Sequence, residues 1–387
     1  MNKEKIFITG MGIISALGNS LDDSLKALQK HQINAGKNDL FDSKIDKPVF
    51  KADLPSKPSL EMRSKELAKY AFDQAITQAK LKDKNHLKIG ICCGTTVASQ
   101  LNDIEFYKKF RAGEVKSFSP VENFLSGNIS ESLLKEYNFS GPGFNVVNAC
   151  SSGTDAIGVA MTWLQNGVCD IAIAGGADEL NLVPIAGFNA LGILSDSVCK
   201  PFDKDRAGLN LGEGAAFLVL EKESTAKFKN TKFHAQCLGY SIAADAYHLT
   251  SPRPDGRGII SAIEKALYHA GLKKEDIGFI NAHGTATKNN DLVEGTVFKT
   301  LFPKTTKILS TKGFTGHTLG AAGAIDAVLT ILSLQNQWLP ASAGFSEQDP
   351  EIGFSPVTKP MDLNANFALS TSLAFGGKNS ALIFGRI

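Results

Sequence analysis

A strong imbalance of charge is absent from the sequence. Its 387 residues include 41 Lys and Arg against 39 Asp and Glu, so the formal net charge is only +2. Such a small surplus gives no electrostatic reason to expect nucleic acid or a membrane surface as a partner. Hydrophobic residues (43%) and charged residues (21%) occur at ordinary globular frequencies, which excludes a disordered chain or a coiled coil.

Cysteines are few for a chain of this length, and no two of them have the C-x-x-C spacing of a metal or redox motif. The six are Cys92, Cys93, Cys150, Cys169, Cys199 and Cys237. A chain of this size buries roughly three quarters of its unfolded surface on folding, so we expect neither a disulfide framework nor a structural metal. The simplest interpretation is a reducing compartment, which predicts a cytoplasmic protein.

Long apolar runs are also missing, so the sequence predicts no membrane span. Residues Ile6–Ile8 briefly resemble a signal peptide, but Gly10, Gly12 and Ser15 interrupt the apolar stretch and no A-x-A cleavage site follows. We therefore expect a first strand followed by a turn. The same glycines form an incomplete dinucleotide-binding motif, because Ser15 stands in place of the third glycine.

What the chain has in abundance is glycine, with 36 residues, which indicates many tight turns and close backbone contacts. Strand-like and helix-like segments alternate, which predicts a mostly parallel α/β fold. The predicted strands are Lys5–Thr9, Ile89–Cys93, Phe144–Val147, Asp170–Ala174, Ala216–Leu220, Phe233–Leu238, Gly278–Asn281, Lys307–Ser310, Ala368–Thr371 and Ala381–Phe384. A charged stretch at 221–232 separates the first five from the last five, so we expect two halves, 1–229 and 230–387.

The two halves follow one plan, which indicates an internal duplication. In the first, a strand runs through Cys150 into the apolar segment Ser151–Leu164, and in the second a strand runs through His317 into Leu319–Leu332. Helices that are apolar all round are buried on every side. We therefore expect two central helices between two sheets, with both helix N-termini opening into one central region.

Cys150 lies in the segment N-A-C-S-S-G-T, at the predicted N-terminus of the first central helix. An arbitrary cysteine is most often a small core residue, but unpaired N–H groups and the helix dipole favour a reactive thiolate at such a position. A free thiol is only roughly 3% ionised at pH 7. Because the dipole contributes just ~0.3–2 kcal/mol, an efficient nucleophile here also requires a nearby His or hydrogen-bond donor.

Two of the seven histidines lie in matching glycine-rich loops, His283 in N-A-H-G-T-A-T and His317 in S-T-K-G-F-T-G-H. A single histidine in such a loop is usually a turn residue. Two at duplicated positions, both expected near a helix-tip cysteine, favour a catalytic role. The remaining five lack such a setting and are interpreted as surface or structural residues: His31, His86, His234, His248 and His269.

Together these segments resemble the β-ketoacyl-acyl-carrier-protein synthases, the decarboxylating condensing enzymes of the thiolase superfamily. The matching motifs are V-N-A-C-S-S-G, N-A-H-G-T-x-T, S-T-K-x-x-T-G-H-x-x-G-A-A-G and F-G-G-x-N, and the likeness runs from about Ile6 to Ile383. The resemblance implies an α/β fold with the thiolase-like, duplicated five-layer α-β-α-β-α architecture. It also implies a homodimer, or a heterodimer with a related ketosynthase-like subunit, and neither a cofactor nor a metal, because the phosphopantetheine arm arrives on an acyl carrier protein.

The resemblance assigns the central chemistry to four residues. Cys150 accepts the acyl group, while His283 and His317 promote decarboxylation of a malonyl extender. Lys312 sets the electrostatics of the site and is expected to pair with Glu294. The implied reaction is a decarboxylative Claisen condensation that gives a β-ketoacyl-acyl carrier protein two carbons longer, in fatty-acid, polyketide or aryl-polyene elongation.

Further residues surround this chemistry by the same resemblance. Thr285 and Thr287 are expected to contact the pantetheine arm. The backbone N–H groups of Cys150 and Phe375 are expected to form the oxyanion hole, and the Phe375 side chain to gate the acyl pocket.

The sequence departs from the common fatty-acid pattern at the last motif. It reads T-S-L-A-F-G-G-K-N, where those members commonly read N-S-F-G-F-G-G-T-N. Ala374 stiffens the loop and Leu373 removes an aromatic residue near the gate, which argues against ordinary long-chain specificity but not against the reaction type. The segment Ser151–Asp155 is closer to polyketide or polyene ketosynthases.

Three alternatives were compared with this interpretation. A biosynthetic thiolase needs a second cysteine near the C-terminus, and none follows Cys237. An initiating synthase has Asn where this chain has His317. A non-catalytic chain-length partner in a ketosynthase heterodimer lacks the nucleophile, and Cys150 argues against that role.

Basic residues at helical spacing, Arg63, Lys65 and Lys69, suggest either a solvated helix face or a docking patch for an acidic carrier protein. A second basic group comprises Lys108, Lys109, Arg111 and Lys116.

Overall fold

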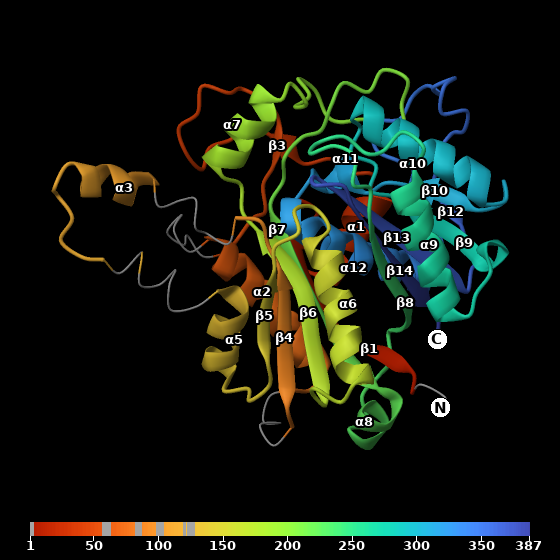
Figure 1. Ribbon diagram of the computed structural model, residues 1–387, viewed down its shortest axis with the longest axis horizontal. Helices are drawn as coiled ribbons and strands as arrows, with labels where there is room; N and C mark the ends of the chain where they lie inside the picture. Colours follow the sequence, from red (N-terminus) through yellow and green to blue (C-terminus); the bar gives the residue numbers. More distant parts are fainter. Residues whose placement is uncertain (1–3, 56–62, 82–86, 98–103, 119–120, 122–127) are drawn as a thin grey trace.

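The protein, seen in a computed structural model, is described at residues 4–55, 63–81, 87–97, 104–118, 121 and 128–387 (Figure 1). The strands of its main sheet are β1 (Ile6–Ser15), β4 (Ile89–Gly94), β5 (Gly143–Val146), β6 (Ile171–Asp178), β7 (Gly214–Lys222), β8 (Ala235–Ala244), β9 (Ile277–Asn281), β10 (Lys307–Leu309), β13 (Phe367–Ala374) and β14 (Lys378–Gly385). Two short ribbons pair β2 (Ala35–Gly36) with β3 (Val49–Phe50) and β11 (Trp338–Leu339) with β12 (Met361–Asp362).

Helices connect and cover these strands. The α-helices are α1 (Leu21–Gln29), α2 (Arg63–Gln78), α3 (Ile104–Arg111), α5 (Ile129–Tyr137), α6 (Ser152–Gln165), α7 (Leu182–Ala190), α8 (Glu223–Phe228), α9 (Arg257–Ala270), α10 (Lys288–Leu301), α11 (Lys312–Thr315) and α12 (Ala322–Asn336). In the described part of the chain, two single 3₁₀ turns are η3 (Lys274–Asp276) and η4 (Leu319–Ala321). Every one of the ten predicted strands therefore has a counterpart in the main sheet.

The sheet topology shows the internal duplication. The first half has the spatial order β5-β4-β6-β7-β1, and the second has β10-β9-β13-β14-β8. If the strands of each half are numbered from one to five along the chain, both orders are 3-2-4-5-1. Strands β1 and β8 join the halves through a short antiparallel ladder between residues 6–8 and 235–237. The exact division at residues 229 and 230 stays a prediction.

The expectation of a mostly parallel sheet is wrong. Parallel pairing is confined to β4 with β5 and β6, and to β9 with β10 and β13. The fourth, fifth and first strands of each half pair antiparallel. Between β13 and β14 the cause is local, because Gly376 and Gly377 both adopt positive φ and reverse the chain in a tight turn, which only antiparallel strands can use.

The glycines near the N-terminus serve packing. The first strand continues past the predicted turn to Ser15, with a register irregularity between Ile8 and Gly10. A Cβ atom built on Gly10 would lie 2.2 Å from the carbonyl oxygen of Ala75, and one on Gly12 would lie 1.9 Å from that of Ala71. Both glycines therefore let α2 contact β1 directly, which accounts for their spacing without a nucleotide.

Two buried helices, α6 and α12, fill the space between the half-sheets, as the sequence predicts. Helix α6 packs on β4 and β6, and α12 packs on β7 and β13. Helices α2 and α5 cover the outer face of the first half-sheet, and α9 covers that of the second. The N-termini of α6 and α12 meet through glycines, because a Cβ atom on Gly323 would lie 2.0 Å from the Thr154 Oγ1 atom. This is the predicted five-layer arrangement with a common central region.

One stretch, Leu319–Asn336, is long and apolar enough to cross a membrane by length and composition alone, which corrects the expectation that no run reaches that length. Its place in the fold explains the composition. Of its 18 residues, 89% are buried inside the protein, so it is a core helix between two sheets.

The contact between α6 and α12 predicts the effect of a single added methyl group. We expect Gly323→Ala to lower the free energy of unfolding by about 1–3 kcal/mol, because the new Cβ atom overlaps Thr154. Gly187→Ala in α7 is the matched control, since nothing lies within 4 Å of its Cβ position. Denaturant unfolding followed by circular dichroism measures both, and equal stability of the two variants would contradict the close contact.

Candidate active site

The strained turn before α6 presents Cys150. Strand β5 ends at Val146, and the chain then turns through Ala149, which has a φ of +49°. A left-handed backbone is unfavourable for alanine, so the surrounding hydrogen bonds must hold it. The Ser152 hydroxyl supplies two of these, since it accepts from the N–H of Asn148 at 2.8 Å and donates to the carbonyl oxygen of Ala149 at 2.6 Å. The turn therefore fixes Cys150 at the helix tip, where it is only 6% exposed.

The thiol of Cys150 is protonated at neutral pH in the free protein. Burial raises its pKa to about 11, although the charge of Lys312 and the backbone N–H groups of Phe375 and Cys150, which face the sulfur, act in the opposite direction. The increase in the Cys150 pKa caused by burial is thus larger than the decrease caused by Lys312 and the N–H groups. These N–H groups come from the turn just before α6 and from the turn between β13 and β14, so the two halves of the fold meet at the sulfur.

The structure brings Cys150, His283 and His317 together. His283 follows β9, and His317 lies between α11 and η4, so both come from the second half of the fold, whereas Cys150 comes from the first. One side-chain nitrogen or sulfur atom from each of the three lies within 4.8 Å of the others. The two imidazole rings are 5.2 Å apart between centroids and nearly perpendicular, at 87°. A substrate carbonyl near the sulfur would therefore also lie close to both rings.

Both imidazoles are neutral. Burial, followed by the charge of Lys312, lowers the pKa of His317 to about 3. The same two causes, with a contribution from His317, lower the pKa of His283 well below its ordinary value. The Nδ1 atom of His317 accepts a hydrogen bond from the N–H of Leu319 at 3.1 Å, so its proton resides on Nε2. His317 is thus a neutral donor with a defined tautomer.

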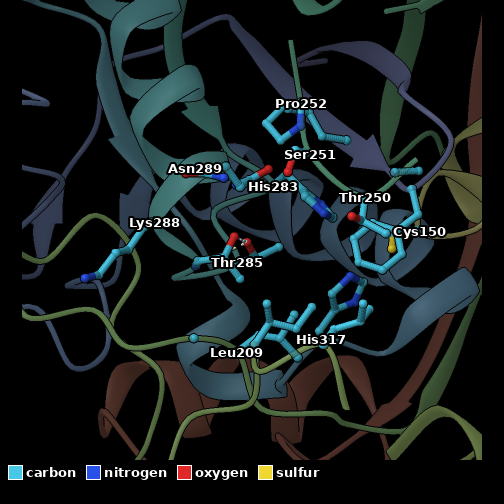
Figure 2. A pocket seen from close by; sticks show the side chains of 18 of the residues that line it. Cys150, Leu209, Thr250, Ser251, Pro252, His283, Thr285, Lys288, Asn289 and His317 are labelled. Carbon is cyan, nitrogen blue, oxygen red and sulfur yellow. Dashed lines mark hydrogen bonds between the residues drawn. The ribbon is translucent and has the colours of Figure 1, made fainter. Parts of the chain in front are cut away.

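The site opens into a cavity of about 400 Å³ (Figure 2). Cys150, His283 and His317 line one part of it, and Figure 2 shows Lys288 at the opposite end. Thr285 and Thr287 lie on the wall between, with their hydroxyl oxygens 2.9 Å apart. The residues predicted to contact a pantetheine arm therefore lie along the same cavity as the thiol.

Phe375 also lines this cavity, stacked against Phe188 of α7 with ring centroids 5.5 Å apart and an interplanar angle of 14°. Its backbone N–H faces Cys150, as the resemblance implies for an oxyanion hole. Leu191, Ile193 and Leu373 add apolar surface beside the two rings. Phe375 thus contributes an N–H group beside the thiol and an aromatic ring to the wall of the cavity.

Comparison with protein families decides the assignment of this site. The β-ketoacyl synthase N-terminal domain matches residues 3–226, and the β-ketoacyl synthase C-terminal domain matches residues 234–346. The chain belongs to the β-ketoacyl synthase family.

Individual relatives agree over the full length. The 3-oxoacyl-[acyl-carrier-protein] synthase 2 of Vibrio cholerae is 32% identical over 418 residues, which cover 100% of both chains. The solved structure of the ishigamide ketosynthase/chain length factor matches 100% of both chains at 28% identity with a TM-score of 0.93. The ketosynthase ApeO, in complex with its chain length factor ApeC from Xenorhabdus doucetiae, matches at 31% identity and a TM-score of 0.85, covering 99% of this chain and 98% of that one. The predicted family and fold are confirmed.

The predicted pairing of Lys312 with Glu294 is wrong for this β-ketoacyl synthase. The Lys312 Nζ atom lies 2.8 Å from a carboxylate oxygen of Asp326 on α12, and both side chains are almost fully buried. Glu294 instead accepts from the backbone N–H groups of His283 and Gly284, at 2.9 and 2.7 Å. Burial raises the pKa of Glu294 to about 7. Glu294 therefore holds the His283 loop, and Asp326 orients Lys312.

The predicted carrier-docking patch is also wrong at its first residue. Arg63 is 6% exposed, and its guanidinium pairs with Glu213 in the interior. Lys65 is half-buried on α2, and Lys69 pairs with Glu136. The second basic group lies on exposed positions in and after α3.

Two site residues were missed in the sequence. Asp326 is the one acidic residue of the apolar helix α12, a signal that a buried cation must lie nearby. Asp178 accepts from the N–H of Gly320 at 2.6 Å and from the N–H groups of Thr96 and Val97, and so fixes the turn beside His317. Its position at the end of a strand carries no comparable signal, because its partners are remote in sequence.

Lys312 provides a direct test of the electrostatics. We expect the double variant Lys312→Met, Asp326→Leu to raise the pKa of His317 above about 3 but leave it below 6.5, because the positive charge is removed while burial remains. Because the starting value is about 3, NMR titration of the labelled imidazoles must run from about pH 2 to pH 8 to measure the change.

The matched control removes a remote buried pair, Lys229→Met with Glu221→Leu, whose charged atoms lie 2.7 Å apart. Its His317 titration should equal that of the unaltered protein. An unchanged titration in the Lys312 variant as well would show that burial alone keeps His317 neutral.

Proposed function

We propose that this β-ketoacyl synthase is an acyltransferase that joins an acyl group held on Cys150 to a malonyl unit held on an acyl carrier protein, by decarboxylative Claisen condensation. One observation carries the proposal. A thiol and two neutral imidazoles, with reactive atoms within 4.8 Å of one another, line one cavity of about 400 Å³. The 3-oxoacyl-[acyl-carrier-protein] synthase 2 and the ketosynthases among its relatives support it.

In the first half-reaction, the Cys150 sulfur attacks the carbonyl carbon of an acyl thioester on the carrier. A carbon–sulfur bond to Cys150 forms, the bond to the carrier sulfur breaks, and the thiol proton ends on the released carrier thiol. The tetrahedral intermediate carries a negative oxygen, and the N–H groups of Cys150 and Phe375 are positioned to donate hydrogen bonds to it. The reaction thus needs both halves of the fold.

In the second half-reaction, the malonyl thioester loses CO₂, and the electron pair of the broken carbon–carbon bond forms an enolate. Its negative oxygen requires N–H donors already in place, and the Nε2–H of His317 is one. Each such donor is typically worth about 10²–10³ in rate. The enolate carbon then attacks the acyl carbon on Cys150, the carbon–sulfur bond breaks, and the thiol is regenerated by a proton from solvent.

Lys312 acts at a distance in this scheme. Its buried charge lowers the pKa of both histidines, after the larger effect of burial, and keeps them as neutral donors. Asp326 balances the charge, which makes burial of the ammonium group tolerable. Lys312 is therefore a positioning and electrostatic residue rather than a proton donor to substrate.

No resident cofactor enters the proposed reaction, because the phosphopantetheine arm is delivered by the carrier. Thr285 and Thr287 line the cavity with hydroxyl groups that suit the amides of such an arm. Acyl chain length and the choice between fatty-acid and polyketide elongation depend on the apolar surface beside Phe375 and on the partner subunit.

We further propose that the protein works as a dimer, with itself or with a related ketosynthase-like subunit. Strand β5 is an edge of the main sheet, and Phe144 within it and Val147 directly after it are 52% and 68% exposed. An edge strand with exposed apolar side chains is suited to pairing with another chain. The solved complex of ApeO with its chain length factor supports the heterodimer.

Six cysteines without a disulfide fit the proposed cytoplasmic location.

The runner-up function is that of a chain-length partner with little or no catalysis of its own. Likeness to structures that contain a chain length factor favours it. The assembled thiol and histidines argue against it, since a partner that performs no acyl transfer has no need of a buried cysteine facing two N–H donors.

Cys150 separates these two functions. We expect the unaltered protein, mixed with an acyl-carrier thioester, to gain the mass of one acyl group, and Cys150→Ala to gain none, because the acceptor sulfur is gone. Intact-protein mass spectrometry measures the adduct, and Cys199→Ala, another buried cysteine, is the control.

Persistence of the adduct in Cys150→Ala would remove the residue from its role. Absence of any adduct in the unaltered protein would favour the chain-length partner. Tightly bound zinc that protects the thiol would indicate that the three residues are metal ligands instead.

The histidines are expected to act mainly in the second half-reaction. His283→Ala and His317→Ala should each slow CO₂ release from a malonyl carrier by about 10²–10³, because each removes one donor to the enolate. Acylation of Cys150 should fall much less, since its oxyanion meets backbone N–H groups. Radiolabelled CO₂ release and acyl-enzyme mass measure the two steps, and His269→Ala, an exposed histidine on α9, is the control. Equal loss of both steps would contradict this division.

A further inference from the structure

The two N–H groups that face the Cys150 sulfur belong to elements far apart in the sequence. One is at the start of α6, and the other is in the turn between β13 and β14. Their usefulness depends on a separation fixed to within a few tenths of an ångström. Something must therefore hold the α6 N-terminus against that hairpin.

We propose that Asp155 is the positioning residue that does so, as the centre of a polar bridge formed by Thr154, Asp155, Tyr240, Ser372 and Ser380. This role deepens the proposed function, on which it rests, by naming what aligns the oxyanion hole. Asp155 lies in the first turn of α6 and is 4% exposed.

The two carboxylate oxygens of Asp155 face opposite partners. Oδ2 accepts from the side chains of Asn148 and Ser151, the latter at 2.8 Å, and these residues lie on either side of Cys150. Oδ1 accepts from the hydroxyl groups of Tyr240 at 2.9 Å and of Ser380. One carboxylate thus joins the nucleophile turn to strands β8 and β14 of the second half.

A second hydrogen bond strengthens this connection at the same level of the hairpin. Thr154 and Ser372 place their hydroxyl oxygens 2.7 Å apart. Ser372 of β13 and Ser380 of β14 are cross-strand partners in the hairpin that carries Phe375. Two consecutive residues of α6 therefore contact both strands of the hairpin in one rung, which restricts both translation and rotation of the Phe375 turn relative to Cys150.

The position of Tyr240 is fixed by a glycine. A Cβ atom on Gly158 would lie 2.2 Å from the Tyr240 ring, so the ring packs directly on the backbone of α6 one turn after Asp155. Its hydroxyl can then reach the carboxylate while the ring remains in the interior. The packing of the ring on Gly158 and the hydrogen bond of the hydroxyl to Asp155 therefore require the same position of Tyr240.

Asparagine cannot replace Asp155 in this bridge. A carboxylate accepts at both oxygens, and all four of its partners are donors. An amide must turn its NH₂ group toward one pair, and the protons of that pair then lose their acceptor, even where a hydroxyl oxygen can accept from the amide instead. We therefore expect the bridge to open without a change in side-chain size.

The test compares two reactions of Cys150 that differ in their need for the oxyanion hole. Acyl transfer from a carrier thioester forms a tetrahedral oxyanion, whereas alkylation by iodoacetamide does not. We expect Asp155→Asn to slow acyl-enzyme formation by about tenfold or more while alkylation stays within about threefold of the unaltered protein. A purely structural defect would reduce both reactions through loss of folded protein.

If Asp155→Asn fails to fold, variants that each remove one hydroxyl group of the bridge test the proposal instead. Tyr240→Phe and Ser380→Ala should each slow acylation by about threefold or more, again without a matching loss of alkylation. The matched controls are Tyr137→Phe and Asp73→Asn, which break a tyrosine–carboxylate hydrogen bond of 2.6 Å in the first half, away from the cavity. Both controls should acylate at the unaltered rate.

The inference is overturned if all folded bridge variants acylate within twofold of the unaltered protein, or if acylation and alkylation fall by the same factor. Failure of the proposed function itself would give a result that can be distinguished from these. If the unaltered protein is alkylated at Cys150 but never acylated, no oxyanion is formed there, and the positioning role falls with it.

Discussion

The electrostatics of the site depend on the buried ion pair between Lys312 and Asp326. An ammonium group in this interior would be strongly unfavourable without its carboxylate 2.8 Å away. Once held there, its charge adds to burial and keeps His283 and His317 neutral. Neutral imidazoles donate hydrogen bonds without attracting the carboxylate of a malonyl group as a counter-ion. The site is therefore built for charge that develops during the reaction.

Duplication explains how so few residues assemble from remote positions. Each half carries its strands in the order 3-2-4-5-1, so corresponding loops lie at the same edge of each half-sheet. Cys150 precedes one central helix and His317 precedes the other, and the two helix N-termini touch through Gly323 and Thr154. Packing of two small-residue helix ends thus places the nucleophile beside its histidines before any side chain is considered.

Local sequence predicted the elements and the grouping of the candidate site residues well. All ten main strands, both buried helices and the meeting of Cys150, His283 and His317 follow from periodicity and from motifs in which the informative residues are neighbours. The errors concern long-range pairing. The single acidic residue of helix α12 already indicates Asp326 as the partner of a buried cation, but nothing near Arg63 shows that Glu213, 150 residues away, draws it inside. Antiparallel pairing outside the β13–β14 hairpin was missed for the same reason, because the direction of those strands is set by partners far along the chain.

Strand β13 connects two parts of the chemistry through adjacent residues. The Thr371 hydroxyl accepts from the N–H of His283 and donates to Glu294, while the next residue, Ser372, contacts Thr154 on the opposite side. Successive residues of a strand face opposite sides, so a shift of register by one position would withdraw both contacts at once. The two proposed half-reactions, although each uses its own hydrogen-bond donors, therefore both depend on the register of this one strand.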